Sequence, residues 1–167
     1  MENIRNDELI MKIEHLRDTI KEQGNFSKTE LNGVIGTAIR GTYYSIAKIS
    51  KTTELVKGKD GRLSFKESEK YGLMLLADKN GKVCIPLYTS LDVVEAARNR
   101  TKERGQIVVM RFSDAAYLCE EDPVISKVVI DPDTLGYYFT KGQIQSIRRN
   151  LIKQIEKDSP SQTFTQS

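Results

Sequence analysis

The sequence predicts an α/β fold, a mixed sheet of about five to six strands with helices packed on it. Apolar residues recur at helical spacing in some segments, such as 9–20 and 144–155, and short β-branched runs such as 107–110 and 127–130 stand between them. Single helices between strands imply right-handed crossovers and parallel neighbours. The Asn-Gly pair at 80–81 predicts an antiparallel hairpin, which makes the sheet mixed.

A pair of helices is expected near the N-terminus, over residues 5–40. The first runs from about Asn6 to Gln23, because an apolar residue falls on one face at every turn. The second begins at Ser27-Lys28-Thr29-Glu30, a capping box in which hydroxyl and carboxylate satisfy the free amides at the helix start. We expect it to end at Gly41.

Strands dominate the middle of the chain. Thr42–Ser50 is β-branched and aromatic, which predicts a strand. The polar stretch Lys57–Lys70 contains Gly58 and Gly61 and predicts a loop. The apolar runs Leu73–Ala77 and Val83–Tyr88 flank the Asn-Gly turn and predict a hairpin.

The remaining segments alternate between strand and helix. In chain order we expect a helix capped by Ser90, a strand over Gln106–Phe112, a helix capped by Ser113, strands over Lys127–Ile130 and Gly136–Phe139, and a last helix capped by Thr140. Residues 1–157 are expected to form one domain. The polar residues 158–167 are expected to be a disordered tail.

The composition argues against several classes of partner. The net charge is +3, from 26 basic and 23 acidic residues, and the basic runs at 98–104 and 148–153 contain no aromatic residues, so we expect no nucleic-acid partner. No stretch approaches the roughly 20 apolar residues of a membrane helix, so we expect no membrane partner. The N-terminus has no apolar signal segment, and a cytoplasmic location is expected.

Few residues suit catalysis or metal binding. His15 is the one histidine, and Cys84 and Cys119 have no Cys or His at ligand spacing, so a histidine-rich zinc site or a Ser-His-Asp triad is hard to build. The glycines at 33–36 and 58–61 match neither a phosphate loop nor a dinucleotide fingerprint. We therefore expect a non-enzymatic protein without metal or cofactor, with both thiols buried and reduced.

The predicted parallel strands bring polar residues to one edge of the sheet. This edge, at the carboxyl ends of the strands, is the usual ligand crevice of open α/β sheets. Helix capping by Ser90 and Ser113, at about 1 kcal/mol each, and a turn at Asp131-Pro132 explain the same residues without a ligand. The candidate surface at this edge comprises Tyr88, Thr89, Ser90, Ser113, Asp131 and Pro132.

Two pairs of adjacent tyrosines, at 43–44 and 137–138, lie on predicted strands. Side-chain alternation places one tyrosine of each pair inward and one outward. Because exposed tyrosines anchor protein interfaces, Tyr44 and Tyr138 join the candidate partner surface. The strand Thr42–Ser50 would then pair with a strand of the partner across a free edge. Core filling is the alternative for at least one tyrosine of each pair.

Three segments resemble one protein family. Gly81–Ser90 resembles the "P-v-F/Y-T-S" strand and helix cap of SseB-type proteins, named for enhanced serine sensitivity. Val128–Pro132 resembles the family's "v-v-I-N-P" element, with Asp131 where Asn is usual. Gly136–Thr140 resembles the return strand before the closing helix. The resemblance extends over about Leu73–Arg149 and implies a bacterial protein with an SseB N-terminal-domain-like α/β fold and no established catalytic mechanism or cofactor.

The leading hypothesis is a non-enzymatic interaction domain that binds another protein or a second copy of itself. A second hypothesis is a small-ligand sensor or enzyme that uses the crevice at the carboxyl edge. It predicts a concave pocket lined by Tyr88, Thr89, Ser113 and Asp131. A third is an accessory or immunity protein of a secretion or toxin system, since some relatives are associated with such gene neighbourhoods.

Overall fold

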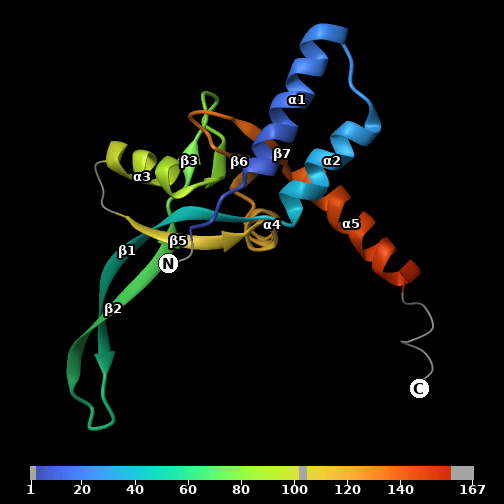
Figure 1. Ribbon diagram of the computed structural model, residues 1–167. Coiled ribbons are helices and arrows are strands. Elements are labelled where there is room, and N and C mark those ends of the chain that lie inside the picture. The colour runs from blue at the N-terminus through green and yellow to red at the C-terminus, as the bar shows by residue number, and fades with distance from the viewer. Residues whose placement is uncertain (1–2, 102–104, 159–167) are drawn as a thin grey trace, which may run out of the picture.

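The computed structural model describes residues 3–101 and 105–158, with all their side chains except those of 49–56, 65–71 and 152–158. These residues form helices and strands in alternation, which confirms the α/β fold (Figure 1). In chain order the elements are α1 (Asp7–Gln23), α2 (Lys28–Ile39), β1 (Thr42–Lys57), β2 (Leu63–Leu73), β3 (Leu76–Ala77), β4 (Val83–Leu87), α3 (Leu91–Arg100), β5 (Gln106–Arg111), α4 (Phe112–Glu121), β6 (Ile125–Ile130), β7 (Tyr137–Thr140) and α5 (Lys141–Asp158). Of the predicted tail, only Asp158 lies within the described residues, where it ends α5.

The strands form two sheets. The predicted mixed sheet has the order β3-β4-β6-β7, in which β4 and β6 are parallel and the outer pairs are antiparallel. The other sheet, β2-β1-β5, is antiparallel throughout. The expectation that β5 lies parallel to β4 and β6 is therefore wrong. Helix α3, which connects β4 to β5 in the chain, packs on β1 and β5. Strand β5 therefore lies at the edge of β1 instead of beside β4.

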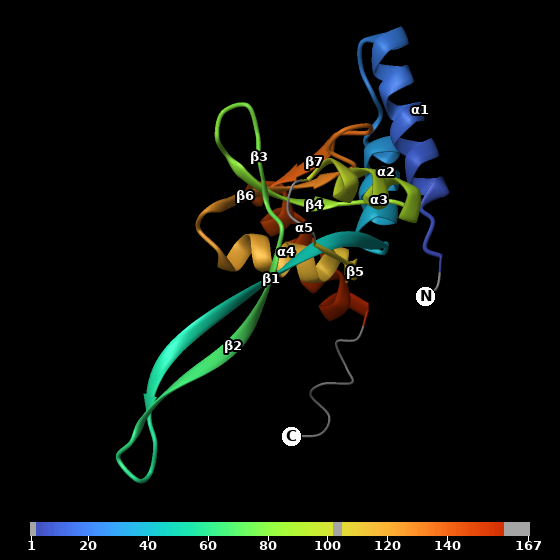
Figure 2. The same cartoon turned by 90° about the vertical axis from the view of Figure 1, so that its left-hand side faces the viewer.

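A long two-stranded arm projects from the body of the protein (Figures 1 and 2). The register of β1 and β2 continues from Ala47 opposite Leu73 to Lys57 opposite Leu63. The turn is closed by the amide of Gly58, which donates to the carbonyl of Arg62 at 2.8 Å. The loop predicted for Lys57–Lys70 is thus mostly strand. Polarity indicated a loop, but the two strands are joined by main-chain hydrogen bonds, which polar side chains do not prevent.

Strand β1 pairs with β5 over Thr42–Ala47 and with β2 over Ala47–Lys57, and its first part, Tyr43–Ala47, is buried. Tyr43 and Tyr44 point to opposite faces, and both are 0% exposed. Tyr43 enters the main core, and Tyr44 enters a second core beneath α3 with Tyr88 and Val94. The expectation of an outward tyrosine here is therefore wrong, and over Thr42–Ala47 the expected free edge is paired with β5 and, at Tyr44, with Tyr88.

Local signals place most helix ends correctly. The Ser27 hydroxyl accepts from the amide of Glu30, the Ser90 hydroxyl from that of Val93, and the Thr140 hydroxyl from that of Gln143. Ser113 caps nothing, because α4 begins at Phe112. The buried ring of Phe112 packs edge-on against Phe139 at 5.1 Å between centroids, which draws the helix start toward the core.

Among the described residues, no helix combines the length and apolar character that crossing a membrane requires.

Candidate functional site

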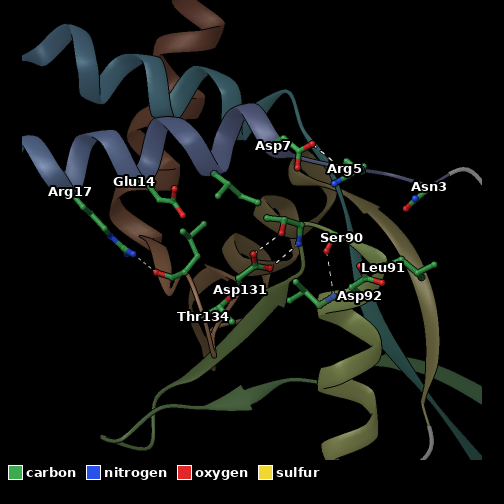
Figure 3. Close-up of a pocket in the computed structure, with 14 residues that line it drawn as sticks. Asn3, Arg5, Asp7, Glu14, Arg17, Ser90, Leu91, Asp92, Asp131 and Thr134 are labelled. Atoms are coloured by element: carbon green, nitrogen blue, oxygen red, sulfur yellow. Dashed lines mark hydrogen bonds and ion pairs between the residues drawn. The ribbon is translucent and has the colours of Figure 1, made fainter.

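A crevice of about 600 Å³ lies between α1 and the carboxyl ends of β4 and β6 (Figure 3). One wall is α1 and the segment before it, and the other wall is the first turn of α3. Of the residues predicted for this edge, Thr89, Ser90 and Asp131 line the crevice, whereas Tyr88 and Ser113 do not. The crevice lies here because β4 and β6 are parallel and therefore end at the same edge of the sheet, where the chain leaves both strands.

Asp131 forms the floor of the crevice and ties β6 to the end of β4. It is 3% exposed, and its Oδ1 accepts from the Thr89 amide at 2.9 Å while its Oδ2 accepts from the Thr89 hydroxyl at 2.6 Å. Its own amide donates to the carbonyl of Leu87 at 2.8 Å. Its φ of 48° lies in the left-handed region, and its carbonyl accepts from the amides of Thr134 and Gly136. Asp131 is therefore both a turn residue and a fixed acceptor.

Burial raises the pKa of three groups around this floor. It raises the pKa of the Asp131 carboxyl, although the two hydrogen bonds from Thr89 act in the opposite direction. Burial, with the charge of Asp133, raises the pKa of Tyr88 to about 12. Burial and the charge of Asp131 raise the pKa of Tyr43 as well. Both phenols are therefore neutral at physiological pH.

The segment before α1 is held against the strand ends. The Asn6 side-chain amide donates to the carbonyls of Thr42 at 3.0 Å and Thr89 at 2.9 Å. The amide of Ile4 donates to the Tyr44 hydroxyl at 2.8 Å. These bonds fix one wall of the crevice. Sequence reasoning treated Asn6 as a helix start, and nothing in the local pattern indicated this bridging role.

Charged side chains line the crevice on both walls. The four carboxylates and two guanidinium groups belong to Asp7, Glu14, Asp92, Asp131, Arg5 and Arg17. Both guanidinium groups have partners, since Arg5 Nε lies 3.5 Å from Asp7 Oδ2 and Arg17 donates to the Leu135 carbonyl. Within residues 3–101 and 105–158, the side chains of Glu14 and Asp92 form no hydrogen bond or ion pair.

The contribution of α1 was missed from the sequence. Glu14 and Arg17 stand three residues apart on the polar side of α1, a pattern that indicates a solvated face. They line the crevice because the core contacts of Leu9 and Ile13 lay α1 across the edge of the mixed sheet. In the sequence, only the spacing of Glu14 and Arg17 shows that the two residues share one face of the helix. The spacing does not show which part of the protein lies opposite that face.

The other predicted site residues are dispersed. Ser90 lines the crevice and caps α3, whereas Pro132 lies half-buried in the turn after β6. Ser113 lies on the exposed side of α4, beside a different groove. Tyr138 is 52% exposed on β7, and Lys127 Nζ stands 4.7 Å from its ring centroid.

Tyr44 and Tyr88 are buried together between the two sheets. The amide of each donates to the carbonyl of the other, at 2.9 and 2.8 Å. This pair joins β1 to the end of β4 and brings the two sheets into contact. Neither tyrosine is presented to a partner.

The residues most suited to nucleophilic or metal chemistry lie away from the crevice. His15 is exposed on α1, with Nε2 4.0 Å from Glu30 Oε2. Cys84 and Cys119 are buried free thiols, and burial raises the pKa of both. In the part of the chain that the structure describes, no three His, Cys, Asp or Glu side chains are grouped to hold a metal ion.

Comparison with protein-family models matches residues 28–146 to the family described as SseB protein N-terminal domain. This match confirms the resemblance seen in the sequence and extends it upstream to α2 and the arm. No curated protein and no solved structure matches the chain.

Proposed function

This chain belongs to the SseB family, and we propose that it is a non-enzymatic interaction domain whose crevice binds a basic segment of a partner protein. The observation behind this proposal is the excess of carboxylates in the crevice, two of which have no partner in the described part of the chain.

The charge of the crevice favours a cationic group. Arg5 is paired with Asp7. Arg17, which stays charged while it donates to the Leu135 carbonyl, forms no ion pair with Glu14 on α1 or Asp92 on α3, so the carboxylates of the crevice remain in excess. These two carboxylates come from opposite walls (Figure 3). A Lys or Arg side chain entering between them would meet a negative potential from both sides, which also speeds encounter with a basic partner.

The length of the crevice favours a peptide. It follows α1 from Asp7 to Arg17, ten residues that rise by about 15 Å. An extended chain advances about 3.3 Å per residue, so four or five residues of a partner would fill this length. The first turn of α3 lies at the opposite wall, and the amides at a helix start have no intrahelical acceptor, so those that Ser90 does not cap could donate to a peptide carbonyl.

The absence of catalytic activity is part of the proposal. Both oxygens of Asp131 already accept hydrogen bonds from Thr89, so this carboxylate is poorly placed as a general base. The one histidine, His15, lies outside the crevice, and the two thiols are buried elsewhere. These placements support binding over chemistry at this edge.

A second candidate function is the binding of a small zwitterionic ligand. The start of α3 opens on the crevice beside Arg5, and a helix N-terminus attracts negative charge. A small molecule could place its anionic group there and its cationic group near Glu14. This second function would use the same crevice as the first. Its test must therefore distinguish an effect of the ligand's size from an effect of its charge.

The test uses an array of short peptides that differ only in charge. We expect basic peptides to bind the full chain and acidic ones not to bind, with affinity that falls as salt rises. The double variant Glu14→Gln, Asp92→Asn should weaken binding between about twofold and thirtyfold, because each exposed pair contributes roughly 0.2–1 kcal/mol. Glu121→Gln, exposed on α4, is the matched control.

Equal binding of acidic peptides, or full affinity in the double variant, would refute the proposal. A small zwitterion that raises the melting temperature of the wild type but not of the double variant, in the absence of peptide binding, would favour the second candidate.

A further inference from the structure

A second groove, of about 270 Å³, lies between α4 and α5. Each helix presents residues at i, i+3, i+4 and i+7 spacing to it, which is one continuous helical face. Ala116, Tyr117 and Glu120 line it from α4, and Ile147, Arg148 and Leu151 from α5. The walls are mostly apolar, and no residue of this groove lines the crevice.

One residue of this apolar groove, Glu120, carries a buried carboxylate. Its side chain is 7% exposed, and its Oε2 accepts from Arg148 Nη1 at 2.8 Å. Its Oε1 is buried and has no hydrogen-bond partner among the residues that the structure describes. A buried carboxylate oxygen without a donor is costly, and native proteins rarely retain one without a role.

The groove rim is also unusually apolar. Tyr117 on α4 is 60% exposed and Leu151 on α5 is 44% exposed, so large apolar surface faces solvent on both sides of the groove. The α4 face from Ser113 to Glu120 is about 10 Å long, which matches two turns of another helix. Paired helical walls of this kind bind amphipathic helices through their apolar side chains.

We propose that this groove binds an amphipathic helix of a partner protein, which inserts apolar side chains between α4 and α5 and, after a rotamer change of the Glu120 side chain, donates from a Lys or Arg to its Oε1. The charge supports a cationic donor. Arg148 contacts one oxygen of Glu120 and is itself 60% exposed, so the buried carboxylate is only partly compensated. The groove is separate from the crevice, and the inference stands independently of the proposed function.

The experiment selects phage-displayed helical peptides of random sequence on the full chain. Enriched peptides should share apolar residues at i and i+4 and a Lys or Arg one turn away. Their affinities are then measured by fluorescence anisotropy. Leu151→Arg should abolish binding, and Glu120→Gln should weaken it by about tenfold. Met11→Arg, at an exposed apolar residue on α1, and Glu121→Gln should leave it within about twofold.

A double-mutant cycle distinguishes the proposed contact from a structural role of Glu120. The peptide lysine is replaced by norleucine, which keeps the apolar stem and removes the charge. On the wild type this replacement should cost about as much affinity as Glu120→Gln. On Glu120→Gln it should cost little, because the partner of the lysine is already gone. Independent losses would overturn the contact.

Other outcomes would overturn the proposal as a whole. These are no enrichment, or peptides that bind Leu151→Arg as well as the wild type. A concentration-dependent dimer in sedimentation that Leu151→Arg dissociates would assign the groove to a second copy instead. Amide resonances of residues 159–167 that shift in Leu151→Arg would assign it to the chain's own C-terminal segment.

Discussion

Replacing Asp131 by alanine should destabilise the protein more than any single surface substitution. The change removes both hydrogen bonds to Thr89 and leaves the Thr89 amide buried without an acceptor, at a cost of about 1–3 kcal/mol. It also places alanine at a φ of 48°, which alanine tolerates less well than aspartate and which costs about 1 kcal/mol more. The expected loss in the free energy of unfolding is about 2–4 kcal/mol.

The loss is measured by urea denaturation followed by circular dichroism, with Asp131→Asn as the matched variant. Asparagine keeps an oxygen for the Thr89 amide and tolerates the left-handed region, so we expect it to lose less than about 1 kcal/mol. The reasoning is refuted if alanine loses less than about 1 kcal/mol, or if asparagine loses as much as alanine.

The same pair of proteins tests the protonation of Asp131. Burial raises its pKa above the ordinary value of 3.8, so the folded protein holds this proton more tightly than the unfolded chain. The resulting stability is fully present below that value and is lost as pH rises through the pKa of the folded state. Asp131→Asn does not titrate, so its stability relative to the wild type should rise between about pH 4 and neutrality. A relative stability that falls with pH would contradict the direction of the shift.

Two further predictions concern close packing and the thiols. Gly41→Ala should lower the free energy of unfolding by about 1–3 kcal/mol, because the new Cβ would lie 2.6 Å from the hydroxyl of buried Tyr43. Gly33→Ala, inside α2 with nothing within 4 Å, should instead raise it by about 0.5–1 kcal/mol, and thermal melts that reverse this order would disprove the packing argument. Cys84 and Cys119 should react slowly with iodoacetamide in the native protein and quickly in urea, since burial blocks access and raises the pKa of both thiols. Rapid alkylation of the native protein, detected by mass spectrometry, would show that they are accessible.

The helix caps and the short hairpin could be predicted because their causes lie within a few residues. Ser27, Ser90 and Thr140 each satisfy an amide three residues downstream, and that spacing is visible in the sequence. The Asn-Gly turn between β3 and β4 also depends on local chemistry, with Gly81 at a φ of 79°. Ser113 had the same cap signal and failed, because the burial of Phe112 starts α4 earlier.

The candidate crevice was located in part. The parallel direction of β4 and β6 was predicted, and their direct pairing in the structure brings Thr89 and Asp131 to one edge. Glu14 was not predicted, since its position in the crevice depends on where α1 crosses the sheet. The buried carboxylate of Glu120 was also invisible in the sequence, because a charged residue on an amphipathic helix normally faces water.

Sequence by itself determined which segments of this protein outside the arm become helix or strand, where most helices start, and which edge of the mixed sheet is polar. These properties depend on side-chain periodicity and on hydrogen bonds between near neighbours. Only the tertiary structure decided that β5 joins β1, that Tyr44 is buried and that carboxylates from α1 and α3 line one crevice. Hydrophobic patterning specifies that a face must be covered, but the element that covers it is chosen by the packing of the whole chain.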